Sequence, residues 1–262
     1  MRKLSASRWA WEALRRNAEY RRDAADRPEG ELEIREACRG IKLIRPRIDQ
    51  TLAERWGLAF MPDPNLNALE AELFWSDQVY PRKLTVQVSP RQPGEVCEFF
   101  ERTTAICRIT HFTDRVGREQ FVLKTDSCAV QVRCEGLSLV SGAPVRMSVM
   151  FSQLEQIEHK LKLLERALGL YGEPAPVEKP VWRRDSLALR NAIIALDCIE
   201  AGLSQYECAR IVYGAEHAEA DWKAPGGALK SEIKRAFRKG VYLRDGGYRD
   251  LLESPQTRRR AA

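Results

Sequence analysis

The feature that most constrains the fold is an alternation of apolar and polar residues between Lys83 and Phe151. Successive side chains of a β-strand point to opposite faces of a sheet, so a period of two is typical of strands with one buried face. Residues that favour turns separate the apolar runs at 90–94, 114–117, 125–127 and 136–142. The pattern predicts an antiparallel meander of five or six strands, built on Leu84, Val86, Val88, Ile109, Phe121, Leu123, Val130, Val132, Val145, Met147 and Val149.

Helices are expected before this β region. Residues 8–23 predict a helix for which Ser7 is placed to act as the cap. A second helix is expected from Pro46 to about Trp56, because proline suits the first position of a helix.

The clearest helix follows the strands, from Ser152 to Leu168. Ser152 and Glu155 form a capping box at its start, and Gly169 stands where a C-cap belongs. Its leucines and isoleucine recur at spacings of 3, 4, 3 and 4, which is the narrow seam of a coiled coil. Two interpretations stay open, a helix laid on the sheet and a contact between subunits. The second predicts a homo-oligomer that assembles through Leu154, Ile157, Leu161, Leu164 and Leu168.

The last third of the chain predicts three helices. The first is capped by Asp185 and ends at Gly202. In the second, Ser204 and Glu207 form a capping box, Ala209 lets a crossing helix approach, and Gly214 can adopt a left-handed turn. This pattern is typical of the first half of a helix-turn-helix, although the connection 215–225 is longer than the usual turn of three or four residues.

The third helix, expected from about Gly227 to Leu243, carries an apolar stripe of Leu229, Ile233, Ala236 and Phe237. Its remaining surface is largely cationic, as the major groove of double-stranded DNA requires. An ordinary amphipathic surface helix would show the same stripe, but DNA binding is favoured because the basic residues follow a capped, alanine-bearing helix. The predicted DNA-binding residues are Lys230, Ser231, Lys234, Arg235, Arg238 and Lys239, with Gln205 and Arg210 from the second helix.

The distribution of charge supports a polyanion-binding C-terminal end. The chain has 262 residues and a net charge of +6, and eleven Lys and Arg residues against four acids lie between 223 and 262. The whole basic excess is therefore confined to the last forty residues. The preceding stretch, 185–221, holds seven acids and only two arginines.

Several classes of protein are not supported by the sequence. Phosphate-binding, dinucleotide-binding, nucleophile-elbow and zinc-protease motifs do not occur, so we expect neither an enzyme nor a bound cofactor. The seven cysteines contain no C-x-x-C pair and are interpreted as reduced thiols rather than metal ligands. No apolar run approaches the roughly 20 residues of a membrane span, and we expect a cytoplasmic protein with no membrane partner.

These features predict an α+β protein with N-terminal helices, a central antiparallel β-meander with a packed helix, and a C-terminal all-α domain that is helix-turn-helix-like. Glycine and proline cluster between 172 and 180 and predict a stiff linker. The expected segments are a helical region at 1–82, the β region plus helix at 83–170, the linker at 171–184, the DNA-binding domain at 185–255, and a basic tail at 256–262.

The stretch from Leu196 to Leu252 resembles the C-terminal DNA-binding domain of the RovC- and FseA-like bacterial transcriptional activators. The similarity is carried by 200–205, 211–214, Asp221-Trp222, 229–231 and 246–252. Segments 11–17, 20–23, 55–58 and 74–75 resemble the regulator-like part that precedes it in those proteins.

This resemblance implies activation of genes of integrative conjugative elements or type VI secretion, promoter DNA as partner, and a homo-oligomer, for at least one kind a hexamer. RNA polymerase is a further candidate partner. Single-domain relatives that act as antiactivators by binding the activator provide the alternative, a regulator that binds another transcription factor rather than DNA.

Overall fold

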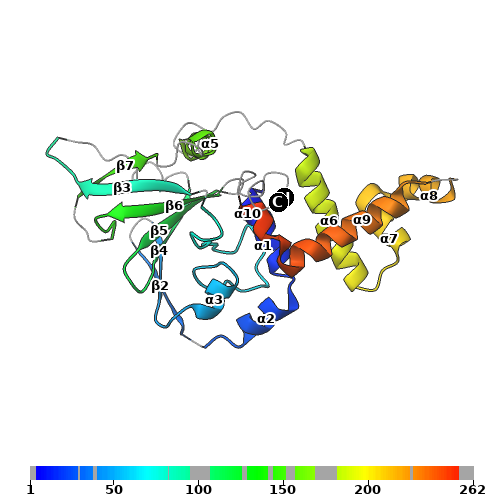
Figure 1. Cartoon of the computed structure of the whole chain (residues 1–262), viewed down its shortest axis with the longest axis horizontal. Coiled ribbons are helices and arrows are strands. Elements are labelled where there is room, and N and C mark those ends of the chain that lie inside the picture. Colours follow the sequence, from blue (N-terminus) through cyan, green and yellow to red (C-terminus); the bar gives the residue numbers. More distant parts are fainter. Residues whose placement is uncertain are drawn as a thin grey trace. The chain divides into compact units, whose positions relative to one another are not determined.

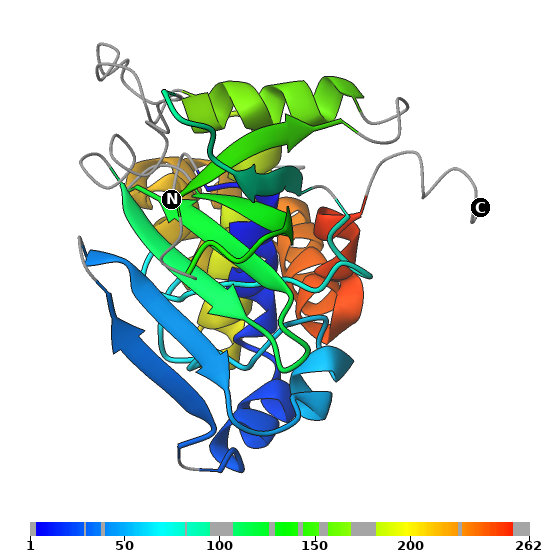
Figure 2. The same ribbon diagram turned by 90° about the vertical axis from the view of Figure 1, so that its left-hand side faces the viewer.

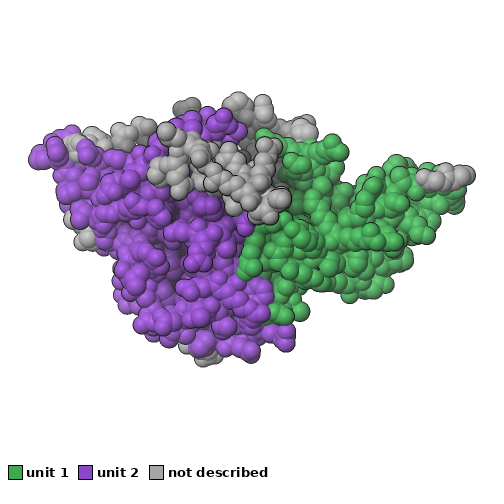
Figure 3. All heavy atoms as spheres, viewed as in Figure 1, with its two compact units in different colours: residues 1–21, 179–251 green, residues 22–178, 252–262 purple. Residues whose placement is uncertain are grey.

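The structure, a computed structural model, describes residues 4–28, 30–37, 40–81, 83–94, 107–125, 129–140, 144–151, 157–168, 182–224 and 227–253. The chain forms two compact units. Unit 1 joins residues 1–21 to 179–251, and unit 2 holds 22–178 and 252–262 (Figure 3). In the described residues, no helix is both long enough and apolar enough to cross a membrane.

Unit 2 is built on a sheet whose seven described strands are ordered β1-β2-β4-β5-β6-β3-β7 (Figures 1 and 2). Five strands follow Lys83, as the alternation in the sequence predicted, but β4 and β5 are buried on both faces rather than on one. The strands are β1 (Leu32–Glu36), β2 (Lys42–Pro46), β3 (Leu84–Pro90), β4 (Arg108–Thr113), β5 (Glu119–Lys124), β6 (Ala129–Gly136) and β7 (Val145–Met150).

The prediction of a purely antiparallel meander is wrong. Only β4, β5 and β6 follow one another as a meander, while β2 pairs with β4 and β3 pairs with β6 in parallel. The long stretch between β3 and β4, residues 91–107, separates them in the sequence far enough for β3 to lie beside β6 and β7 instead. The hairpin of β1 and β2 was also missed, because the region 1–82 was expected to be helical.

Both faces of the sheet are covered. Helix α5 (Ile157–Leu168) contacts β3 and β6, and its Leu163 and Ala167 join the core formed by the inward residues of the strands. On the other face, Phe60, Phe74 and Phe112 pack with ring centroids 5.3–5.9 Å apart. The predicted helix on the sheet is therefore confirmed, whereas its capping box and Leu154 lie outside the described residues.

The N-terminal helices are shorter than predicted. Residues 8–23 form two helices, α1 (Ala6–Leu14) and α2 (Ala18–Ala25), because the Asn17 side chain accepts a hydrogen bond from the Tyr20 amide at 3.0 Å and starts α2. The N-cap of α1 is Ser5 rather than Ser7. Pro46 ends β2, and helix α3 covers only Thr51–Arg55.

Unit 1 contains the C-terminal helices. The structure has a helix over 215–223, where the sequence predicted a loop. The elements are α6 (Arg184–Glu200), α7 (Gln205–Tyr213), α8 (Ala215–Lys223), α9 (Leu229–Tyr242), the π-helical turn η3 (Leu243–Gly247) and α10 (Arg249–Leu252).

The ends of α6 show one wrong and one confirmed prediction. Asp185 is not the cap, since α6 starts at Arg184 and Asp185 lies in its first turn. Gly202 does end the helix, with φ of 81°. The amide of Leu203 donates to the Cys198 carbonyl at 3.0 Å, which is the pairing of a Schellman motif.

Candidate nucleic-acid interface

Helix α9 has one buried and one exposed side. Leu229, Ile233 and Gly240 are buried, and Ala236 and Phe237 pack against the same core. Gly240 lies where α9 crosses α6 (Figure 1), because a Cβ there would approach the Ala192 carbonyl to 2.5 Å. The opposite side exposes all six residues that the sequence predicted for this helix, namely Lys230, Ser231, Lys234, Arg235, Arg238 and Lys239.

The five cations of this set form no ion pair with any described residue, and we call the six residues the basic face. Two other cations of unit 1 are paired: Lys223 Nζ lies 2.6 Å from a Glu219 carboxylate oxygen, and Arg16 Nε lies 2.6 Å from Asp197. The basic face therefore keeps its full positive charge for an external anion.

The one acid within α9, Glu232, is directed to a neighbouring helix. Its carboxylate accepts a hydrogen bond of 2.8 Å from the Tyr213 hydroxyl at the end of α7. Burial and this hydrogen bond raise the pKa of Tyr213 to about 12. Glu232 thus contributes to the packing between α7 and α9.

The start of α9 is held by a residue that sequence reasoning did not single out for this role. Asp221, in α8, accepts hydrogen bonds from the amides of Ala228 at 3.2 Å and Leu229 at 2.9 Å. Gly227 lies so close to Asp221 that a Cβ would come within 2.1 Å of its carbonyl oxygen. A carboxylate of the protein already occupies this helix end, so contacts to DNA would come from side chains of the basic face.

Helix α7 begins as predicted. The Ser204 hydroxyl accepts from the Glu207 amide at 3.2 Å, and the Glu207 carboxylate accepts from the Ser204 amide at 2.8 Å. Of the two residues predicted to contact DNA from this helix, Arg210 is exposed and Gln205 is half-buried. The Arg210 guanidinium lies 5.9 Å from the centroid of the Tyr206 ring.

The arrangement of α7 and α9 differs from a tight helix-turn-helix pair. Helix α8 stands between them in the chain, although α7 contacts both α8 and α9. The helix joined to α7 by the short turn at Gly214 is therefore α8, which exposes Glu216 and Glu219. These acids would repel phosphates, so α8 is unsuited to contact a phosphate backbone. The cationic surface lies instead on the next helix, α9.

The N-terminal helix α1 belongs to this unit and contacts α6 and η3. Both oxygens of Asp197 in α6 accept from Arg16, at 2.6 and 2.8 Å, and Arg16 also pairs with the buried Glu12 at 2.8 Å. The side-chain amide of Asn17 donates through Nδ2 to the Arg244 carbonyl at 3.1 Å. Sequence reasoning missed the contacts with Asp197 and Arg244 because they join residues 181 and 227 positions apart.

Of the predicted oligomerisation residues, Leu154 lies outside the described residues, and the other four lie in unit 2, on α5. Ile157, Leu161 and Leu168 are 36%, 45% and 55% exposed, whereas Leu164 is half-buried against the core of the sheet. Among the described residues, no group of three His, Cys, Asp or Glu side chains could hold a metal ion.

Two family models match the chain. Residues 149–253 match the DNA-binding domain of a type VI secretion transcription factor, RovC, and residues 1–61 match a proteobacterial transcriptional regulator-like domain. The protein is therefore a transcriptional regulator with a DNA-binding domain, and both models describe regulators rather than enzymes. Within that class, the two matched segments are similar to RovC-like regulators, as the resemblance at both ends of the sequence implied. No curated protein shows a significant match to the chain.

Proposed function

We propose that the chain is a sequence-specific activator of transcription that binds double-stranded promoter DNA through the basic face of α9. The observation that carries this proposal is the set of five exposed cations with no ion pair among the described residues, on a helix anchored by its opposite side. Such a helix fits the width of the major groove.

Within the basic face, we assign different tasks to the two ends. Lys230, Ser231 and Lys234 lie nearer the start of α9 and are the candidates for contacts with base edges. Arg235, Arg238 and Lys239 are assigned to phosphates, with Arg210 and Gln205 of α7 as further contacts. The domain then acts as a helix-turn-helix-like module with one additional acidic helix, α8.

The test is the salt dependence of binding to a promoter duplex. The logarithm of the binding constant should fall linearly with the logarithm of salt concentration, by about 0.9 per neutralised phosphate, and Lys234→Ala should reduce the slope by about one. Lys223→Ala is the matched control, because Lys223 is a neighbouring lysine already paired with Glu219. Equal slopes for both variants, or binding that does not respond to salt, would contradict the proposal.

The family match makes type VI secretion promoters the first duplexes to examine, with promoters of integrative conjugative elements next. A reporter fused to the bound promoter separates activation, which should raise its output, from repression. The alternative function is that of an antiactivator-like regulator that binds another transcription factor. It predicts no duplex binding in the absence of that protein, and a complex that survives Lys234→Ala.

A further inference from the structure

The start of α6 carries two cations that the DNA-binding proposal does not use. Arg183 and Arg184 are exposed, and neither side chain forms a hydrogen bond or an ion pair with any described residue. Asp185 follows them and is also exposed, but it pairs with neither arginine. Both guanidinium groups are therefore available to an external anion.

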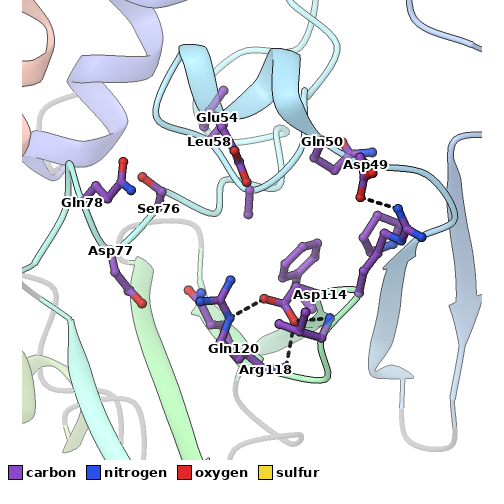
Figure 4. A pocket seen from close by; sticks show the side chains of 15 residues that line it. Asp49, Gln50, Glu54, Leu58, Ser76, Asp77, Gln78, Asp114, Arg118 and Gln120 are labelled. Atoms are coloured by element: carbon purple, nitrogen blue, oxygen red, sulfur yellow. Dashed lines mark hydrogen bonds and ion pairs between the residues drawn. The ribbon is translucent and has the colours of Figure 1, made fainter.

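Two exposed arginines of unit 2 provide a contrast, because acids of the chain already hold them. They line a polar cavity of about 310 Å³ (Figure 4). Arg115 pairs with Asp49 there, and Arg118 Nε donates to Asp114 at 2.6 Å. Exposure alone therefore does not leave an arginine without a partner in this chain.

The charges of α6 are divided between its two halves. Arg190 lies in the same half as the two arginines, whereas Asp197 and Glu200 lie near the other end. Asp197 accepts from Arg16 at 2.6 and 2.8 Å. Glu200 pairs with Arg244, so both of these acids are already occupied. The unpaired positive charge of α6 is therefore concentrated at its start.

The backbone at the start of α6 is held in place by local contacts. The Arg190 guanidinium lies 5.5 Å from the centroid of the Trp182 ring, in a cation–π contact that holds the residue before Arg183 against the helix. The Arg183 carbonyl accepts from the Leu187 amide at 2.9 Å and begins the helical hydrogen bonds. Arg183 and Arg184 thus extend from a fixed backbone, which lowers the entropic cost of binding.

The length of α6 beside its crossing with α9 can be compared with the dimensions of DNA. The two helices cross where Gly240 meets Ala192, and the start of α6 extends to one side of this crossing (Figure 1). Arg184 precedes Ala192 by about 12 Å of helix at 1.5 Å per residue. The major groove is also about 12 Å wide. With α9 in the groove, the start of α6 is therefore far enough from the crossing to reach phosphates at the border of the groove.

We propose that Arg183 and Arg184 form a second DNA contact, which binds backbone phosphates to one side of the stretch covered by α9. This inference rests on the proposed function, because it takes α9 as the helix in the major groove. A distance of about 12 Å corresponds to about 3–4 base pairs at 3.4 Å per step, and the contact lengthens the bound duplex by that amount. Phosphate contacts carry no sequence information, but they fix the register and orientation of the helix that reads the bases.

The test is the salt dependence of binding of the full chain to the promoter duplex. Arg183→Gln with Arg184→Gln should reduce the slope by about two, since each neutralised phosphate contributes about 0.9. Arg183→Lys with Arg184→Lys should retain the natural slope, because the positive charges are kept. Arg45→Gln with Arg47→Gln, which removes two exposed arginines of unit 2, is the control for the change in net charge and should leave the slope unchanged.

Ethylation of single phosphates locates the contact on the duplex. Ethylated phosphates that weaken binding of the natural chain but not of the Arg183→Gln, Arg184→Gln variant should form one group. This group should lie about 3–4 base pairs from the phosphate whose contact is lost in Lys234→Ala. Circular dichroism confirms that each variant is folded before the titrations.

The outcomes separate this inference from the proposed function. An unchanged slope in the glutamine variant, together with a reduced slope in Lys234→Ala, would overturn the second contact and leave DNA binding by the basic face intact. An equal reduction in the Arg45→Gln, Arg47→Gln control would also overturn it, because net charge alone would then explain the effect. A natural chain that binds no duplex would overturn the proposed function and this inference together.

Discussion

Asp221 accepts two amide hydrogen bonds at the start of α9, and its loss should be measurable as a change in stability. Asp221→Ala leaves the Ala228 and Leu229 amides without these acceptors and should lower the free energy of unfolding by about 1 kcal/mol, as for other caps. Urea denaturation provides the measurement, and Asp221→Asn, which retains an acceptor, should lose less. An effect no larger than that of Glu216→Ala on the exposed side of α8 would contradict this role.

Residue-scale predictions from sequence succeeded where the interaction is local. Ser204 and Glu207 are three positions apart, so their capping box could be recognised from spacing alone. The exposure of the basic face also followed from helical periodicity. Asp221 acts seven and eight residues beyond its own position, across the end of one helix, and no capping pattern spans that distance.

At the scale of the element, α5 turns one side to the sheet and leaves a second apolar stripe exposed. Ile157, Leu161 and Leu168 form that stripe, while Leu163 and Ala167 make the contacts with the core. We predict that the full chain self-associates through the stripe. Leu161→Lys with Leu168→Lys should shift the light-scattering mass toward the monomer, because charged side chains would be desolvated in the contact.

Leu69→Lys is the control for this double variant, because Leu69 is an exposed apolar residue of unit 2 that lies outside α5. It should leave the mass unchanged. A natural chain that is monomeric at tens of micromolar would refute the prediction and leave the leucines of α5 as partly covered surface.

Elements were predicted well where the periodicity was long and poorly where it was short. The strands after Lys83 and helices α5, α6, α7 and α9 all gave clear patterns. The β1–β2 hairpin left only a weak pattern in the sequence. Strand β1 contributes Leu32 and Ile34, β2 contributes one pair of adjacent apolar residues, and Gly40 lies between the two strands. The parallel pairing of β3 with β6 depends on strand order, which no local pattern contains.

For the whole molecule, the membership of α1 in unit 1 changes what a C-terminal fragment can do. Trp11 packs edge-on against Tyr20 at 5.6 Å in α1 and α2, and both are buried. A fragment of residues 179–253 lacks α1 and should melt at a lower temperature than unit 1 does in the full chain. A peptide of residues 1–21 added in trans should raise that temperature in a saturable manner.

The control is the same peptide with Trp11→Ala. It should stabilise the fragment less, because truncation of a buried tryptophan costs roughly 3–5 kcal/mol. A fragment that is unaffected by either peptide would show that α1 is dispensable for the helices 184–251.

The composition of unit 1 also affects when its helices can pack together during translation. Helix α1 is synthesised first, but α6 and η3, which it contacts, are synthesised only after residues 22–178 of unit 2. Closing such a long loop is slow compared with forming local contacts. The sheet of unit 2 therefore has time to fold before the N-terminal helix finds its partners. A transcript cut short before α6 yields a product that cannot assemble the basic face, so promoter occupancy would report only on molecules whose translation has passed α9.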